Sequence, residues 1–295
     1  MTLSEATSAG LREGGLDPDA VCSLAQRALA EDLSFGPDAT TEAVVSPAAR
    51  SAGAFVARRS GVLAGVYVAA AVCEVASAGE LGVRVERGDG SRLSPGDVVA
   101  SVSGPTRALL TAERSALNLL CHLSGVATLT RRWVDAVAGS GAAVRDTRKT
   151  TPGLRALEKY AVRCGGGENH RMGLGDAALI KDNHVAASGS VTAAFHAVRA
   201  AAPLLAVEVE CDTLEQVDEA LAVGADLILL DNMDLATMRR AVESARRRAG
   251  VRLEASGGLT LEEAPAVAAT GVDYLAIGAL THSAPVLDIG LDLPL

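Results

Sequence analysis

The chain has 295 residues, of which 49% are hydrophobic and 21% are charged, and its net charge is −9. This length favours two domains, or one barrel with an appended segment, and the composition excludes a disordered protein. The negative charge and the 2% aromatic content argue against a nucleic-acid binder and against a protein that binds anionic membranes.

The cysteines and the apolar stretches indicate the compartment. The five cysteines are far apart and form no Cys-x-x-Cys pair, which predicts reduced thiols. Residues 1–20 lack the basic start and apolar centre of a secretory signal. The apolar stretch 60–73 is shorter than the roughly 20 residues that cross a bilayer. We therefore expect a cytoplasmic protein with neither a membrane nor a nucleic-acid partner.

The beginning of the chain is predicted to contain a helix and then a mixed sheet. Residues 1–16 are expected to form a loose lead-in. Apolar residues at helical spacing predict a helix over 18–31, with Asp17 as its N-cap and Pro18 as its first residue. Short apolar runs broken by Gly and Pro predict strands over 52–103.

Three more helices are predicted before the pattern changes. One covers 68–78, between the strands of the mixed sheet. Two others cover 111–123 and 127–138, and Gly125 separates them. The first part of the chain is therefore expected to be a mixed sheet with helices.

From residue 142 onward, apolar runs alternate with helix-like segments. The predicted strands cover 142–144, 177–180, 204–209, 226–230, 251–253 and 272–277. This alternation predicts a parallel sheet with right-handed crossovers. Six strands are fewer than the eight of a complete barrel, so either a strand escapes the pattern or the barrel is incomplete. The last stretch, 285–295, alternates like a short strand that can return to the first domain.

Polar residues follow the ends of these predicted strands. In a β/α barrel the carboxyl ends of all strands lie at one face, and that face carries the active site. The strand ends thus bring to one cavity Arg148, Lys149, Lys181, Glu210, Asp231, Ser256 and Gly278. The alternative is that charged residues simply mark strand ends at the surface, but five strand ends with polar groups make it the weaker interpretation.

The segment from Arg145 to Arg171 is cationic in an otherwise acidic protein, with seven Lys or Arg against three acidic residues. Such a patch indicates a small anionic substrate, since Arg binds carboxylate or phosphate through two hydrogen bonds and Lys offers a point charge. Part of the patch, Arg155, Glu158 and Lys159, is expected to be the exposed face of a helix.

Two glycine features fit a phosphate. Ser256-Gly257-Gly258 and Gly278 follow the last two predicted strands, where barrels commonly bind phosphate through backbone N–H groups. The alternative is that each glycine only permits a turn.

Two carboxylates, Glu210 and Asp231, end successive strands. They are candidates to hold Mg²⁺ directly or through water, or to stabilise a cationic sugar in a transition state. The alternative is that they pair with nearby Lys and Arg. His122, His196 and His282 lack metal-ligand spacing and are expected to be structural.

A series of ordered motifs carries a family resemblance. They are ERSALN (113–118), LSGVAT (123–128), DTRKTTPGLR (146–155), EKYAV (158–162), GGG (165–167), NHR (169–171), LIKDNH (179–184), EVE (208–210), LDN (230–232) and EASGG (254–258). Together they resemble the quinolinate phosphoribosyltransferases over most of the chain. The resemblance implies an α/β fold with an N-terminal α/β sandwich domain, 1–125 with 286–295, and an incomplete parallel β/α barrel, 126–285.

The resemblance also implies a reaction and an assembly. Quinolinate and phosphoribosyl pyrophosphate would give nicotinate mononucleotide, pyrophosphate and CO₂ with Mg²⁺, a step of de novo NAD synthesis. The family forms homodimers with shared active sites, so a homodimer or a higher oligomer is expected.

Site roles follow from the resemblance one residue at a time. The quinolinate-binding positions are Arg148, His170, Arg171 and Lys181, with Arg114 reaching in from the partner subunit. The phosphoribosyl pyrophosphate positions are Lys149, Glu210 and Asp231, the two carboxylates also serving the metal, and Ser256, Gly257, Gly258 and Gly278 serving the 5-phosphate. Lys149, Lys181, Glu210 and Asp231 are the expected catalytic residues.

One position departs from the family pattern. Cys121-His122 stands where relatives often have Gln-Arg, so any substrate contact made by that Arg would be weaker or replaced.

Three other functions compete with this one. A related phosphoribosyltransferase acting on nicotinate or another base would need fewer cations for its substrate. A Schiff-base aldolase would use a lysine such as Lys181 at a strand end. A ligand sensor without activity is disfavoured because the other charged motif positions are intact.

Overall fold

The computed structural model describes residues 2–293, whose contacts form two compact units. The first unit comprises 2–129, 152–166 and 283–293, and the second comprises 130–151 and 167–282. The segment 152–166 thus belongs to the first unit although it lies between two strands of the second. The domain boundaries 125/126 and 285/286 remain predictions, because compactness alone does not define a folding domain.

The first unit is built on a four-stranded antiparallel sheet. Its strands, in spatial order, are β12 (Ile289–Asp292), β1 (Arg50–Ala57), β5 (Val98–Pro105) and β3 (Gly82–Val85). A separate pair joins β2 (Gly61–Val62) to β4 (Arg92–Leu93). The pairing of β12 with β1 confirms the predicted return of the last segment to the first domain.

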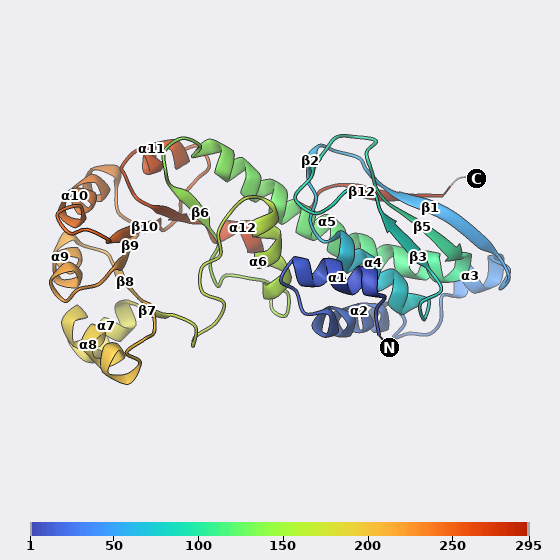
Figure 1. Ribbon diagram of the computed structural model, residues 1–295, viewed down its shortest axis with the longest axis horizontal. Helices are drawn as coiled ribbons and strands as arrows, with labels where there is room; N and C mark the ends of the chain where they lie inside the picture. The colour runs from blue at the N-terminus through green and yellow to red at the C-terminus, as the bar shows by residue number, and fades with distance from the viewer. Residues whose placement is uncertain (1, 294–295) are drawn as a thin grey trace. The chain divides into compact units, whose positions relative to one another are not determined.

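The first unit contains α1 (Glu5–Glu13), α2 (Pro18–Asp32), α3 (Ala39–Val44), α4 (Val66–Ala76), most of α5 (Thr106–Ala136) and α6 (Arg155–Cys164). Of these, α2, α4 and α5 pack on one side of the sheet (Figure 1). Apolar side chains of α2, α4 and α5 bury the inner sheet face around Phe55 and Val102. The helix predicted over 68–78 and the cap by Asp17, whose side chain accepts the Asp19 amide, are confirmed.

Residues 1–16 are not the loose lead-in that the sequence predicts, because α1 covers Glu5–Glu13. The Glu74 carboxylate on α4 accepts hydrogen bonds from the Ser4 amide, the Ser4 hydroxyl and the Thr7 hydroxyl. A nine-residue helix is marginal in isolation, so these long-range contacts hold it in place.

The prediction of two helices separated at Gly125 is wrong, because α5 is continuous. A Cβ at Gly125 would lie 2.2 Å from the Pro285 carbonyl oxygen. The glycine therefore allows close packing of the returning chain against the helix and does not interrupt it.

The predicted exposed face of α6 is also wrong. Glu158 and Lys159 are both 0% exposed, and Arg155 is half-buried. The Glu158 carboxylate lies 2.9 Å from His122 Nε2 on α5. Helical spacing alone cannot distinguish an exposed charged face from one that pairs inside the protein.

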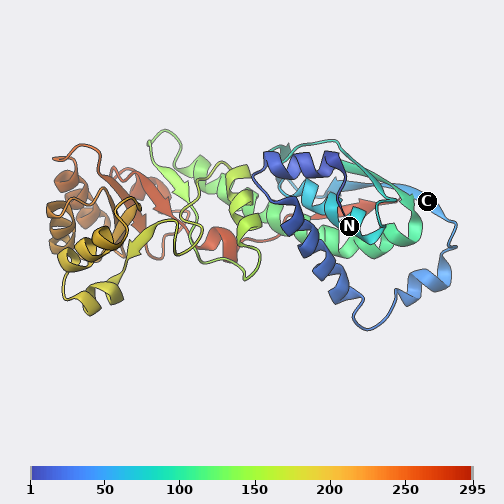
Figure 2. The ribbon, with the colours of Figure 1, turned by 60° about the horizontal axis from the view of Figure 1, so that its bottom comes forward.

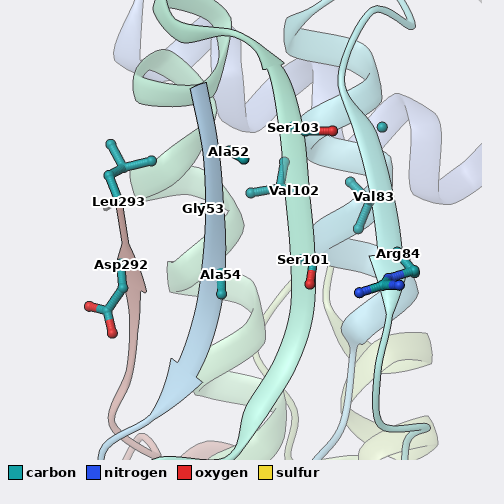
Figure 3. A pocket seen from close by; sticks show the side chains of 11 residues that line it. Ala52, Gly53, Ala54, Val83, Arg84, Ser101, Val102, Ser103, Asp292 and Leu293 are labelled. Atoms are coloured by element: carbon teal, nitrogen blue, oxygen red, sulfur yellow. The ribbon is translucent and has the colours of Figure 1, made fainter. Parts of the chain in front are cut away.

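The outer face of the sheet in the first unit is hollowed (Figure 3). This cavity of about 780 Å³ is lined mainly by small side chains such as Ala52, Ala54 and Ser101, with Arg84 and Asp292 as its charged members. These groups do not converge on one point, so the hollow has no features of a reaction centre.

The second unit contains a six-stranded parallel sheet. Its strands, in spatial order, are β6 (Ala143–Arg145), β11 (Tyr274–Ala276), β10 (Arg252–Ser256), β9 (Leu227–Asp231), β8 (Val207–Cys211) and β7 (Ala178–Ile180). All six predicted strands are confirmed. No strand joins β6 to β7 within residues 2–293, so the barrel is incomplete.

Short helices follow these strands along the chain (Figure 2). They are α7 (Asp182–Ser188), α8 (Val191–Ala201), α9 (Leu214–Ala222), α10 (Leu235–Ala245), α11 (Ala264–Ala268) and α12 (Ala279–His282). Side chains of Ser190, Thr213 and Asp234 accept backbone amides at the starts of α8, α9 and α10. These caps fix where each helix begins, and therefore where the loop after each preceding strand ends. Across 2–293, every helix is either too short or too polar to span a bilayer.

Candidate active site

The alternation of side chains along the strands determines what faces the barrel interior. In a strand, residues two apart share a face. Glu208 and Glu210 of β8 therefore point the same way, as do Glu254 and Ser256 of β10. Asp231 at the end of β9 lies in register with Ser256.

These strand ends line a cavity of about 370 Å³ in the second unit. Its lining consists of Thr147, Arg148, Lys149, His170, Arg171, Leu179, Lys181, Glu210, Leu229, Asp231, Glu254, Ser256 and Ala276. Most of the predicted site residues thus lie around one cavity. Gly257, Gly258 and Gly278 are not among its lining residues, although they follow the lining residues Ser256 and Ala276 closely along the chain. Arg114 does not line it either, because this residue is exposed on α5 in the first unit.

Two guanidinium groups lie on one side of the cavity. Burial, and then the positive charge of Arg148, lower the pKa of Arg171. Arg171 Nη1 donates to the Ala177 carbonyl at 3.0 Å. Arg148 Nε is buried and has no hydrogen-bond partner within residues 2–293. Two neighbouring guanidinium groups, one of which has a buried N–H without an acceptor, favour the binding of an anionic ligand.

Lys181 and Glu210 form an ion pair at the mouth of the cavity. Lys181 Nζ lies 2.6 Å from Glu210 Oε2, and the two side chains are 45% and 12% exposed. Because the lysine is the exposed member of the pair, Lys181 can turn to a ligand at small cost.

The turn after β10 fits closely against the end of β9. The Asp231 carboxylate accepts the Asn232 side-chain amide at 2.7 Å, and the Asn232 backbone amide donates to the Ser256 carbonyl at 3.1 Å. A Cβ at Gly257 would lie 2.3 Å from Asn232 Oδ1, and Gly257 has a φ of +94°. Only glycine fits there, so the bare backbone of this turn is a steric requirement.

A second close approach joins Lys149 to the loop after β11. A Cβ at Gly278 would lie 2.8 Å from Lys149 Cδ and 3.4 Å from His282 Nε2. The Thr281 hydroxyl donates to the Lys149 carbonyl at 2.8 Å. His282, which the sequence suggested was structural, therefore lies beside the Lys149 end of the cavity.

A buried polar network borders the cavity, and its two carboxylates are not among the predicted site residues. His170 Nε2 lies 2.7 Å from Glu208 Oε2 and 3.5 Å from Glu254 Oε1. Arg145 Nη1 lies 3.0 Å from Glu254 Oε2, with its guanidinium over the Tyr274 ring. Strand alternation could have found both carboxylates, because each precedes a predicted site residue by two positions.

This network shifts the pKa values of its members. Burial, and then the charge of Glu208, raise the pKa of Glu254 to about 7, although His170 and Arg145 oppose the shift. Burial acts to lower the pKa of His170, but the hydrogen bond to Glu208 and the charges of Glu254 and Glu208 outweigh it and raise the pKa. His170 Nδ1 accepts a hydrogen bond from the Arg171 backbone amide at 2.7 Å. A ring nitrogen that accepts must be unprotonated, so these contacts describe a neutral imidazole that carries its proton on Nε2.

The carboxylates at the cavity mouth can accept a hard cation. Oε1 of Glu210 and Oδ1 of Asp231 accept no hydrogen bond within residues 2–293. One carboxylate oxygen from each of two residues, with further oxygens from a phosphorylated ligand, is a usual way to bind Mg²⁺. Over the same residues, one group of three side chains has possible metal-binding atoms within 4.8 Å of one another, and it consists of His170, Glu208 and Glu254.

Comparison with known proteins identifies the family. Residues 38–124 match the N-terminal domain model of quinolinate phosphoribosyl transferase, and residues 126–292 match its C-terminal domain model. The chain belongs to the quinolinate phosphoribosyltransferase family. This confirms the resemblance on which the site roles were predicted.

Relatives resemble the chain over almost its whole length. It is 57% identical over 277 residues to the carboxylating nicotinate-nucleotide pyrophosphorylase of Mycobacterium leprae, covering 93% of this chain and 98% of the relative. It is 39% identical to the human protein of the same name, with 94% and 93% covered. Among solved structures, NadC from Streptococcus pyogenes has a TM-score of 0.88 at 41% identity, covering 95% of this chain and 99% of that one.

Proposed function

We propose that the protein transfers the phosphoribosyl group of phosphoribosyl pyrophosphate to quinolinate, with release of CO₂. The products are nicotinate mononucleotide and pyrophosphate, a step of NAD synthesis. The observation that carries this proposal is that Arg148 and Arg171 line one cavity, with tight glycine turns next to its lining residues Ser256 and Lys149. Family membership supports the same function.

Quinolinate is a dianion, and the cationic side of the cavity accommodates it. Arg148 and Arg171 each offer a planar fork of donors that matches a carboxylate. Lys181 supplies a third cation, which a ligand carboxylate can draw away from Glu210. His170 lies beside this group, so the pyridine ring would be held by its two carboxylates.

Phosphoribosyl pyrophosphate would lie across the other side of the cavity. The backbone N–H groups of Ser256, Gly257, Gly258 and Gly278 are the proposed ligands of the 5-phosphate. Lys149 is placed to contact the pyrophosphate. Glu210 and Asp231 would hold Mg²⁺ directly or through water, and the ion would neutralise the pyrophosphate charge.

The chemistry then proceeds in two steps. The pyridine nitrogen attacks the anomeric carbon as the bond to pyrophosphate breaks, and nearby Glu210 and Asp231 stabilise the positive charge that develops on the sugar. The pyridinium next loses its adjacent carboxylate as CO₂, and the electron pair left on the ring carbon takes a proton. Lys149 and Lys181 are the proposed groups that stabilise or protonate this carbanion.

The deciding experiment is product analysis with the purified protein. Quinolinate, phosphoribosyl pyrophosphate and Mg²⁺ should yield nicotinate mononucleotide and CO₂ in equal amounts. Nicotinate in place of quinolinate tests the related phosphoribosyltransferase that acts on a monocarboxylate. Mononucleotide formed from nicotinate, with none from quinolinate, would overturn the proposal.

We also propose a homodimer with shared active sites, in which Arg114 of each subunit completes its partner's cavity. Its exposed position on α5 supports this arrangement. Mixing and refolding inactive Arg114→Ala and Arg148→Ala proteins should then restore up to about a quarter of wild-type activity, since half the dimers are mixed and each holds one intact site. Mixtures that stay inactive would refute the shared site.

We also propose that this reaction takes place in the cytoplasm. The wide spacing of the five cysteines along the sequence supports this compartment.

A further inference from the structure

The segment that carries Arg171 is held from behind by buried carboxylates. Asp146, which is 0% exposed, accepts the Asn169 side-chain amide at 2.5 Å and the His170 backbone amide at 2.9 Å. Glu208, which is 2% exposed, lies 2.7 Å from His170 Nε2. Three hydrogen bonds thus fix the two residues that precede Arg171.

Both ring nitrogens of His170 are occupied by the protein itself. Nε2 donates to Glu208, and Nδ1 accepts the backbone amide of Arg171 at 2.7 Å. A ligand in the cavity would have to break one of these bonds to contact a ring nitrogen. The ring therefore serves to connect Glu208 to the backbone of Arg171.

Glu208 is an unusual residue for its position in the strand. Its side chain is buried on the face of the strand that also carries Glu210, and an apolar side chain would be buried there at lower cost. Its Oε1 atom is buried and has no hydrogen-bond partner within residues 2–293. A buried carboxylate that is only half satisfied is more easily explained by a functional requirement than by stability.

We propose that Glu208 is a positioning residue for the dicarboxylate substrate. It fixes the His170 ring, and through the bond from the Arg171 amide to Nδ1 it fixes the direction of the Arg171 guanidinium. The second anchor of that guanidinium is the Ala177 carbonyl. Glu254, which pairs with Arg145, lies 3.5 Å from the same ring nitrogen, Nε2, that bonds to Glu208. This inference rests on the proposed function, since it assigns Arg171 a substrate carboxylate.

The first test compares Glu208→Ala with Glu208→Gln in steady-state kinetics. The alanine variant removes the acceptor of the Nε2 proton, so KM for quinolinate should rise about tenfold while KM for phosphoribosyl pyrophosphate stays within about twofold. Glutamine keeps an acceptor oxygen in the same place and should restore KM for quinolinate to within about threefold of wild type. Equal rises in the two KM values, or a glutamine variant as impaired as alanine, would overturn the proposal.

The second test asks whether Glu208 acts through Arg171. In an Arg171→Ala background, Glu208→Ala should raise KM for quinolinate by less than about twofold, because the group that it positions is already gone. A full tenfold rise in that background would show that Glu208 acts by another route. If Glu208→Ala does not fold, His170→Phe breaks the same two bonds and must give the same selective effect.

Glu74→Ala is the matched control for a merely structural carboxylate. Glu74 is also buried, and its three hydrogen bonds lie within the first unit, away from the cavity residues. This variant should lower Tm without changing the ratio of the two KM values. A wild-type protein that makes no mononucleotide from quinolinate would instead refute the proposed function itself, so the two failures are distinguishable.

Discussion

At the scale of single residues, the charged groups around the cavity differ in how their charge is balanced. Lys181 pairs with Glu210, whereas Arg148 and Arg171 line the cavity without an ion-pair partner within residues 2–293. Glu208 is buried and does not line the cavity, and its negative charge acts to raise the pKa of Arg171. The charge of Arg171 is thus partly offset by a carboxylate that does not occupy the place of a ligand.

Arg148 should be sensitive to the shape of its side chain as well as to its charge. Arg148→Lys keeps the charge but loses the fork, and we expect kcat/KM for quinolinate to fall about 10- to 100-fold, the loss of one charge-assisted hydrogen bond. Arg131→Lys, on a partly exposed arginine that pairs with Asp135 and does not line the cavity, is the control and should leave kcat/KM unchanged. If Arg148→Lys left kcat/KM for quinolinate unchanged, the two-pronged hydrogen bonding of the Arg148 guanidinium would not contribute to substrate recognition.

The raised pKa of Glu254 predicts a pH dependence of stability. The folded protein holds this proton up to about pH 7, whereas the unfolded chain releases it near the ordinary value of 4.5. The folded state therefore binds more protons between these values, and stability falls as pH rises through that window. Glu254→Gln should lack this loss, which is at most about 3 kcal/mol.

Urea unfolding of both proteins at pH 5 and pH 8 checks this expectation. Relative to wild type, the glutamine variant should be more stable at pH 8 than at pH 5. A stability difference that is the same at both pH values would contradict it.

At the scale of helices and strands, the sequence predicts local signals well and long-range contacts poorly. The six parallel strands and the Asp17 cap follow from apolar runs and capping residues near in sequence. The burial of Glu158 depends on His122, which is 36 residues away along the chain. Such contacts leave no trace in local periodicity, which is why the predicted exposed face of α6 is wrong.

Gly125 offers a test in which two local effects have opposite sign. Inside a helix, Gly→Ala ordinarily stabilises by roughly 1 kcal/mol. At Gly125 the new Cβ would meet the Pro285 carbonyl oxygen, so we expect a net destabilisation of about 1–3 kcal/mol. Gly88, where a Cβ would meet nothing within 4 Å, is the matched control and should change by less than about 0.5 kcal/mol. Chemical unfolding measures both, and a stabilised Gly125→Ala would refute the packing argument.

At the scale of the whole molecule, the chain enters each unit more than once. The segment 152–166 belongs to the first unit, and the last residues return there to form β12. Family motifs predict that two domains exist and which strand ends carry chemistry. The motifs EVE and EASGG contain Glu208 and Glu254, but they do not predict the buried network, because the partners His170 and Arg145 are far away along the chain.

Ligand binding should raise the Tm of the protein, and the size of the increase should depend on the number of carboxylates in the ligand. Quinolinate at 100 times its Kd should add about 2.7 kcal/mol of stability and raise Tm. Nicotinate at the same concentration, with one carboxylate fewer, should raise Tm less, and Arg148→Ala should abolish the difference between the two ligands. Thermal unfolding tests this, and equal shifts from both compounds would argue against recognition of a dicarboxylate.

The incomplete barrel leaves the outer edge of β6 without a neighbouring strand. The Glu168 amide donates to the Val144 carbonyl at 2.8 Å, and the Asp146 amide donates to the Glu168 carbonyl at 3.2 Å. A single residue thus substitutes there for a missing strand, and the chain then turns directly into His170 and Arg171. In a closed eight-stranded barrel, that edge would instead pair with a neighbouring strand along its whole length. Because the barrel does not close, the irregular backbone from Glu168 to Arg171 has two roles. It forms hydrogen bonds with the edge of β6, and it positions Arg171 at the cavity.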